Sequence, residues 1–173
     1  IHLSDKWIAV LGGRLQRYTQ TSSRGFISPA TTLNDSGNAF LPQTGIVYSA
    51  TADLSFYGSY SKSFTPSTQT DANGNVASTE KGTTYELGSK WQVTPGLAAT
   101  LAVYRIDEND MSIFINGVTR NIPKARSSGA DVEVNGEIRP GWDLIANYSY
   151  DKTEIVSDNV NPANVGNRLV NAP

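Results

Sequence analysis

The sequence predicts an all-β protein built from antiparallel strands, and three observations support this fold class. Apolar and polar residues alternate with a period of two over most of the apolar segments, as in a strand whose two faces differ. Short turn-like joints recur at intervals of about 45 residues. Each interval holds two strands and one long polar connection, so about seven hairpin-connected strands are expected. The joints stand near Ser4-Asp5, Thr51-Ala52, Pro95-Gly96 and Pro140-Gly141.

The third observation is the apolar face of the hairpin at 130–151. Trp142 and Tyr150 mark the two ends of this face, which carries no charge between them. Its length is roughly 26 Å at ~3.3 Å per residue, and a tilt of ~40° leaves about 20 Å along a barrel axis. That approaches the apolar band of an outer-membrane β-barrel with its aromatic girdles. A soluble β-sandwich with an apolar inner face is the alternative.

The first two strands are predicted at 6–18 and 40–50. The first places Trp7 and the alternate residues after it on one face, with polar residues opposite. The residues between the two strands are rich in Thr, Ser, Gly and Asn without a period, which indicates a loop. Pro42 lies in the second strand, where proline is acceptable only near a strand start or where no ladder hydrogen bond is needed.

Three further strands are predicted at 54–63, 83–93 and 97–107. The strand at 54–63 sets apolar residues against a row of serines, which is typical of a hydrated wall and not of a packed core. The strand at 97–107 carries small residues, such as Ala98 and Ala102, on its second face. Such a face suits a wall against which another packed body rests.

The remaining residues are predicted to form long polar connections at 20–39, 65–82, 108–125 and 152–172. Because every strand reverses direction, these connections would lie together at the rim opposite the short joints. Residues 111–115 are apolar enough to extend the preceding strand.

The alternation also predicts the register of the short hairpins, since directly opposed residues share a face. Keeping the apolar residues on one side requires an odd number of loop residues, and three is the simplest number. Gly96 and Gly141 would then occupy the left-handed third position. The facing pairs would be Ala50 with Leu54, Val93 with Leu97, and Ile138 with Trp142.

The composition argues against an enzyme. His2 is the only histidine and the chain has no cysteine, so His- or Cys-based catalysis and metal binding have almost no residues to use. Asp131, Glu133, Glu137 and Asp143 form an acidic row on one predicted face, which a hydrated wall explains better than paired catalytic carboxylates do. A net charge of −2 gives no argument for nucleic acid. No cofactor is expected.

Several blocks of this sequence resemble, in order, the barrel of TonB-dependent ferric-siderophore receptors. Each block alone would be weak, but their order and spacing over nearly the whole chain make the resemblance specific. The blocks are SYSKSF at 59–64 with a proline at 66, YELGSK at 85–90, LAVYRI at 101–106 with Asn109, RSSGADVE at 126–133 and PGW at 140–142.

The resemblance implies an outer-membrane transporter of a Gram-negative bacterium, with a plugged barrel of 22 strands. Such a receptor imports an iron chelate with energy that the TonB system passes from the inner membrane. Residues 1–173 would be a partial barrel, without the plug segment that contacts TonB and without the closing strands. Seven strands cannot close, so an open curved sheet is expected, with lipid against its apolar face. A passive porin-like channel remains an alternative.

The family has no fixed ligand motif that could be transferred to this chain. A ferric siderophore is bulky and polar at its metal centre and often has flat organic arms, so aromatic and cationic side chains at the rim are the expected contacts. Within the long connections, Phe114 and Arg120 are therefore the candidate ligand contacts.

Overall fold

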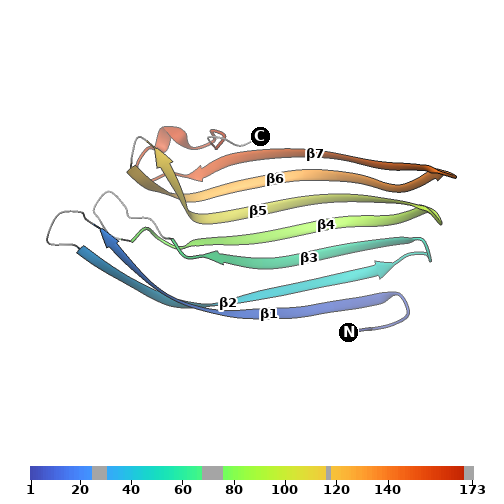
Figure 1. Ribbon diagram of the computed structural model, residues 1–173, viewed down its shortest axis with the longest axis horizontal. Coiled ribbons are helices and arrows are strands. Elements are labelled where there is room, and N and C mark those ends of the chain that lie inside the picture. The colour runs from blue at the N-terminus through green and yellow to red at the C-terminus, as the bar shows by residue number, and fades with distance from the viewer. Residues whose placement is uncertain (25–30, 68–75, 116–117, 170–173) are drawn as a thin grey trace.

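The computed structural model describes residues 1–24, 31–67, 76–115 and 118–169 of the chain. These residues form one antiparallel sheet of seven strands, whose order in space is their order in the sequence (Figure 1). No helix in these ranges is long and apolar enough to cross a membrane. The elements are β1 (Trp7–Arg24), β2 (Thr31–Ser49), β3 (Leu54–Thr65), β4 (Glu80–Thr94), β5 (Leu97–Ile115), β6 (Val118–Arg139), β7 (Trp142–Ser157) and the short 3-10 helix η1 (Pro162–Asn164).

The predicted all-β fold and the open sheet are confirmed. Each strand pairs only with its neighbours in sequence, and β1 and β7 form the two edges. The described residues make a single sheet, so the β-sandwich alternative does not match the architecture. The short turns lie together at one end, on the right in Figure 1, and the other end is called the far end below.

The prediction of long irregular connections is wrong for much of their length. β1 and β2 stay paired as far as Arg24 and Thr31, and β5 and β6 as far as Ile115 and Val118. Most of 20–39 and 108–125 is therefore strand, and the predicted extension at 111–115 is confirmed. Alternation requires that one face be apolar. In stretches whose two faces are both polar, backbone hydrogen bonds between the strands continue, but the alternation of apolar and polar residues disappears from the sequence.

The three-residue loop predicted between β2 and β3 agrees with the hydrogen bonds of this turn. The amide of Ala50 donates to the carbonyl oxygen of Leu54 over 2.9 Å. The strands beyond continue the same register, with Ser49 opposite Ser55. The hydroxyl of Thr51 accepts from the amide of Leu54 over 3.0 Å and fixes the turn.

The three-residue loops predicted at the other two turns are wrong. Thr94 pairs with Leu97, and Arg139 pairs with Trp142, so each loop has two residues, a proline and a glycine. Proline is disfavoured in the middle of a three-residue loop but suits the first central position of a tight turn. Gly141 has a φ of 78°, as the second central position of a type II turn requires, whereas Gly96 does not have a positive φ.

A bulge just before each of these turns restores the predicted faces. The register shifts between Gln92 and Thr94 in β4, and between Glu137 and Arg139 in β6. The extra residue that keeps the apolar residues on one face is thus a bulge in the strand and not a third loop residue. Further from the turn, paired residues again share the face that the sequence predicted, with Trp91 opposite Ala99.

The segment after β7 folds back along the far end of that edge strand. The amide of Ile155 donates to the oxygen of Asn167, and the amide of Gly166 donates to the oxygen of Ile155, both over 2.9 Å. These bonds cover part of an edge that would otherwise expose unpaired backbone groups. Beneath them lies a small buried cluster of Ile122, Ala125 and Ile155.

Candidate functional site

Cross-strand pairing gathers the large apolar side chains on one face of the sheet, called the outer face below. One row of paired residues runs from Ile46 through Gly58 and Leu87 to Val103. These side chains are open to the surroundings, and Leu87 is 65% exposed. Only six hydrophobic residues of the described ranges are buried. The sheet therefore has no second layer that covers its apolar face, which is the arrangement of a lipid-facing wall.

Aromatic residues bound the apolar part of the outer face at both ends. Near the short turns, the rings of Trp7 and Tyr48 lie 4.6 Å apart. Toward the far end, the rings of Tyr60 and Tyr85 lie 5.3 Å apart. Trp91 and Tyr85 are separated by roughly 20 Å of strand. Outer-face positions between these aromatic residues carry no charged side chain, as expected between two aromatic girdles.

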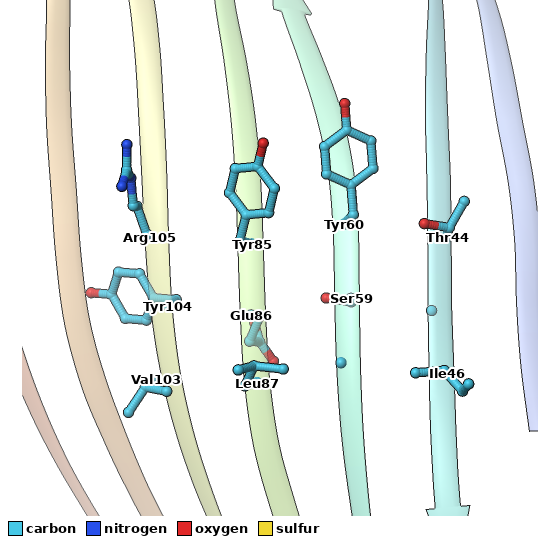
Figure 2. A pocket seen from close by; sticks show the side chains of 12 residues that line it. Thr44, Ile46, Ser59, Tyr60, Tyr85, Glu86, Leu87, Val103, Tyr104 and Arg105 are labelled. Carbon is cyan, nitrogen blue, oxygen red and sulfur yellow. The ribbon is translucent and has the colours of Figure 1, made fainter. Parts of the chain in front are cut away.

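A shallow depression of about 620 Å³ lies over β2 to β5 at the far-end aromatic row. Figure 2 shows Thr44, Tyr60, Tyr85 and Arg105 side by side across the four strands. The row marks the level at which the outer face changes from apolar to charged. The depression is open and lies on the wall itself, so it does not enclose a ligand.

The opposite or inner face is polar and extensively hydrogen-bonded. The hydroxyl of Tyr57 donates to Glu86 over 2.6 Å, and the ammonium group of Lys90 lies 5.7 Å from the centre of the Tyr57 ring. The hydroxyl groups of Tyr104 and Ser127 both donate to Asp151. The polar character that the sequence predicted for this wall is therefore confirmed. The wall also carries the acidic row of Asp131, Glu133, Glu137 and Asp143, whose partners in β6 and β7 are on the same face.

The inner face contains glycine–aromatic pairs that the alternation pattern did not reveal. A Cβ atom on Gly88 would lie 2.5 Å from the Tyr57 ring, and one on Gly129 would lie 2.5 Å from the Tyr104 hydroxyl. Each tyrosine thus lies flat across a neighbouring strand where no side chain intervenes. The available signal was a glycine within a strand pattern, which indicates close approach of another group.

A charged network lies on the outer face beyond the far-end aromatic row. Asp107 accepts hydrogen bonds from Arg105 and from Arg126, with nitrogen–oxygen distances of 2.8 and 2.9 Å. Arg126 also contacts Glu154 at 3.4 Å, and Lys152 lies 3.9 Å from the same carboxylate. Burial alone would raise the pKa of Asp107, but the hydrogen bonds from the two arginines outweigh it and hold that pKa below its ordinary value.

Asp107→Asn is expected to loosen the far-end part of β5 and β6 by roughly 1 kcal/mol, because both arginines lose their shared carboxylate. Because the pKa of Asp107 is lowered in the folded state, ionised Asp107 stabilises the fold fully at pH values above 3.8. This stabilisation is lost as the pH falls from 3.8 through the lowered pKa. Hydrogen exchange of amides near Asp107 checks this. Asp143→Asn, at the other end of the sheet, is the control and should leave those amides unchanged.

The two candidate ligand contacts are strand residues and not loop residues. Phe114 in β5 pairs with Thr119, and Arg120 in β6 pairs with Ile113, near the tip of the hairpin. The backbone bends just before this tip, where Asp110 has a φ of 57°. The side chains of Phe114 and Arg120 lie outside the described part of the structure, so their role in ligand binding stays a prediction.

No group of three or more His, Cys, Asp or Glu side chains that could hold a metal ion occurs in the described ranges. Glu80 and Glu108 approach each other on the inner face at the far end. Burial, and to a smaller extent the charge of Glu80, raises the pKa of Glu108. The inner wall at this end is therefore acidic.

Comparison with known families gives a match over residues 1–173 to the model described as TonB dependent receptor-like, beta-barrel. The chain is 32% identical over 165 residues to the ferric-pyoverdine 358 receptor of Pseudomonas putida, a match that covers 88% of this chain and 20% of that protein. It is 31% identical over 181 residues to the metal-pseudopaline receptor CntO of Pseudomonas aeruginosa, covering 100% of this chain and 25% of that protein.

Solved structures show the same fold. The siderophore receptor PiuA from Acinetobacter baumannii superimposes with a TM-score of 0.83 at 23% identity, over 99% of this chain and 28% of that one. FpvA of P. aeruginosa, in a complex with heterologous pyoverdine, gives a TM-score of 0.70 at 26% identity, over 88% and 21% of the two chains. The chain thus spans a fifth to a quarter of the length of the curated relatives described above.

Proposed function

Because this chain belongs to the β-barrel family of TonB-dependent receptors, we propose that it forms part of the wall of an outer-membrane receptor that imports a ferric siderophore. One observation carries the proposal. The sheet has an exposed apolar outer face between two aromatic rows, and a polar inner face of hydrogen-bonded side chains. A wall with these two faces can separate lipid from a hydrated lumen.

The names of the relatives support a ferric siderophore as the class of ligand. They include receptors for ferric pyoverdine and for ferrioxamine B, the latter from Salmonella typhimurium with 30% identity over 172 residues. In this proposal residues 1–173 are one part of the barrel, and the plug segment that contacts the TonB system belongs to the rest of the receptor. The small inner-face residues Ala98 and Ala102 of β5 would leave room for that plug. The relatives are receptors, so no enzymatic role is proposed.

Uptake by cells tests the proposed function. A Gram-negative strain without its own siderophore receptors would express the complete receptor under iron limitation. Ferric pyoverdines and ferrioxamine B, the ligands named for the relatives, would be supplied in turn as radioactive iron complexes. The expected result is uptake of at least one complex, which is abolished when the TonB system is inactive. Uptake that continues without TonB would instead support a passive porin-like channel.

The candidate contacts Phe114 and Arg120 are tested in the same receptor. Phe114→Ala and Arg120→Ala should each weaken binding of the transported complex by roughly tenfold, the effect of losing one stacking or charged contact. The matched controls, Phe56→Ala and Arg105→Ala, change the same residue types on the outer face. They should leave affinity unchanged. Unaltered affinity in both tip variants would remove these residues as ligand contacts.

A further inference from the structure

We propose that Glu80 is a positioning residue for ligand binding, because its carboxylate holds the far-end hairpin of β5 and β6 at a fixed angle to the wall. The far-end hairpin consists of the paired residues 111–115 and 118–122, which include Phe114 and Arg120. The inference rests on the proposed function, since it takes a ferric siderophore to bind at this end. It goes further by assigning a role to a residue that acts through the hairpin and does not touch the ligand itself.

The far-end hairpin has a neighbouring strand on one side fewer than the rest of the wall. In the described ranges β4 pairs with β5 only as far as Lys81 and Asn109. β5 and β6 stay paired with each other as far as Ile115 and Val118. Figure 1 shows the far ends of β5 and β6 turning away from β4. One edge of β5 therefore has no strand beside it beyond Asn109.

The ladder between β5 and β6 is interrupted at the base of this hairpin. The register omits the pair of Asp110 with Pro123 and resumes with Met111 opposite Ile122. Asp110 has a φ of 57°, a left-handed conformation that regular strands do not use. Pro123 has no N–H group to donate to the ladder. Because both strands depart from regular pairing at the same height, the angle of the hairpin to the wall is not fixed by the ladder alone.

The carboxylate of Glu80 spans this interruption. The amide of Ser112 donates to Oε1 of Glu80 over 2.7 Å, in a partly buried position. Glu80 is the first residue of β4 and is paired with Thr65 of β3, so it belongs to the wall. Successive residues of an antiparallel strand direct their backbone groups to opposite sides. The carboxylate thus takes the place of the carbonyl group that a longer β4 would offer to Ser112, and its charge makes the hydrogen bond stronger.

On its other side the hairpin is held by apolar packing. Met111 and Ile113 pack against the buried cluster described above. The hydroxyl of Ser112 lies 3.4 Å from the side-chain oxygen of Asn121, its partner within the hairpin. Apolar contacts have little directional preference, whereas a hydrogen bond depends steeply on its angle. The bond to Glu80 is therefore the contact that sets the direction of the hairpin.

The test measures uptake kinetics of the complete receptor in cells, with ferrioxamine B and ferric pyoverdine as the probes. Glu80→Ala should raise the half-saturating concentration of the transported complex about tenfold, the effect of losing one charge-assisted hydrogen bond. The maximal rate should stay unchanged, because transport after binding does not involve the hairpin angle. Glu80→Gln should remain within about threefold of the parent, since its amide oxygen still accepts from Ser112. A merely destabilising change would lower the maximal rate through loss of folded receptor.

Two matched controls separate position from charge. Glu86→Ala removes a carboxylate from the same face of β4, where it accepts from Tyr57 and not from the hairpin. Glu108→Gln removes the neighbouring charge in β5, opposite Gly82. Both should change the half-saturating concentration less than about twofold. Equal weakening by Glu108→Gln and Glu80→Gln would show that negative charge attracts the ligand, and this overturns the proposal.

Hydrogen exchange of the hairpin amides, measured in the complete receptor without ligand, tests the same contact independently of the proposed function. Glu80→Ala should speed this exchange about tenfold, while Glu80→Gln and Glu86→Ala should not. Unchanged exchange in Glu80→Ala overturns the inference even if no ferric complex is taken up. Faster exchange with an unchanged half-saturating concentration overturns it as well. If Glu80→Ala does not fold, Glu80→Asp decides, because it keeps the charge but is one methylene too short, so it should behave as expected for Glu80→Ala.

Discussion

Gly136→Ala is expected to destabilise the receptor by roughly 3 kcal/mol, because the added methyl group combines backbone strain with a steric clash. Gly136 has a φ of 138°, which side chains of L-residues rarely adopt. A Cβ atom at this position would overlap the carbonyl oxygen of Gly96, which accepts the amide of Glu137 over 2.9 Å. The obstacle is backbone, so it cannot move aside as a side chain could.

The measurement is the urea midpoint of unfolding of the complete receptor in lipid vesicles, followed by tryptophan fluorescence. Gly12→Ala is the matched control, because a Cβ atom on Gly12 would meet its nearest neighbour, the oxygen of Gln43, at an ordinary 3.8 Å. The control should change stability by less than about 0.5 kcal/mol. Equal midpoints for the two variants would contradict the backbone geometry described at Gly136.

Leu101→Arg is expected to cost about 2–4 kcal/mol, the range for an arginine at the middle of the bilayer on the lipid face of a barrel. Leu101 lies on the outer face between Ser89 of β4 and Val132 of β6, and it is 50% exposed. The cost arises because the guanidinium group would meet acyl chains in place of water.

Asn147→Arg is the control for this prediction, since it introduces the same side chain on the inner face at nearly the same height of the sheet. Asn147 of β7 faces inward opposite Glu133 of β6, so an acidic neighbour is present. Folding yield into vesicles and the unfolding midpoint should change little for this variant. If the two arginine variants lose stability equally, the outer face does not contact lipid and the proposed orientation fails.

The strand positions could be predicted because alternation is a local property. In β6 and β7, for example, Val132 and Tyr148 share the apolar face as the sequence indicated. The ends of the strands could not be predicted. Beyond Tyr18 in β1 the side chains on both faces are polar, so the period-two signal is lost although backbone pairing continues to Arg24.

The candidate site was only partly predictable for a similar reason. The acidic inner row at Asp131 and Glu133 follows from the alternation, and the structure places it where expected. Tyr104 lying across Gly129, and Asp107 holding Arg126, are contacts between different strands. Such contacts depend on the register of each strand against the next, which no single segment of sequence specifies.

The sequence by itself determined the all-β class, the seven strands, their two faces and the family, because each depends on local residue patterns or on ordered similarity along the chain. Only the tertiary structure decided where neighbouring strands stop pairing. Pro42 reads as a minor irregularity within β2, but opposite Lys62 it ends the ladder and opens a cleft. The physical reason is that a missing N–H group matters only when the strand that would accept its hydrogen bond is known.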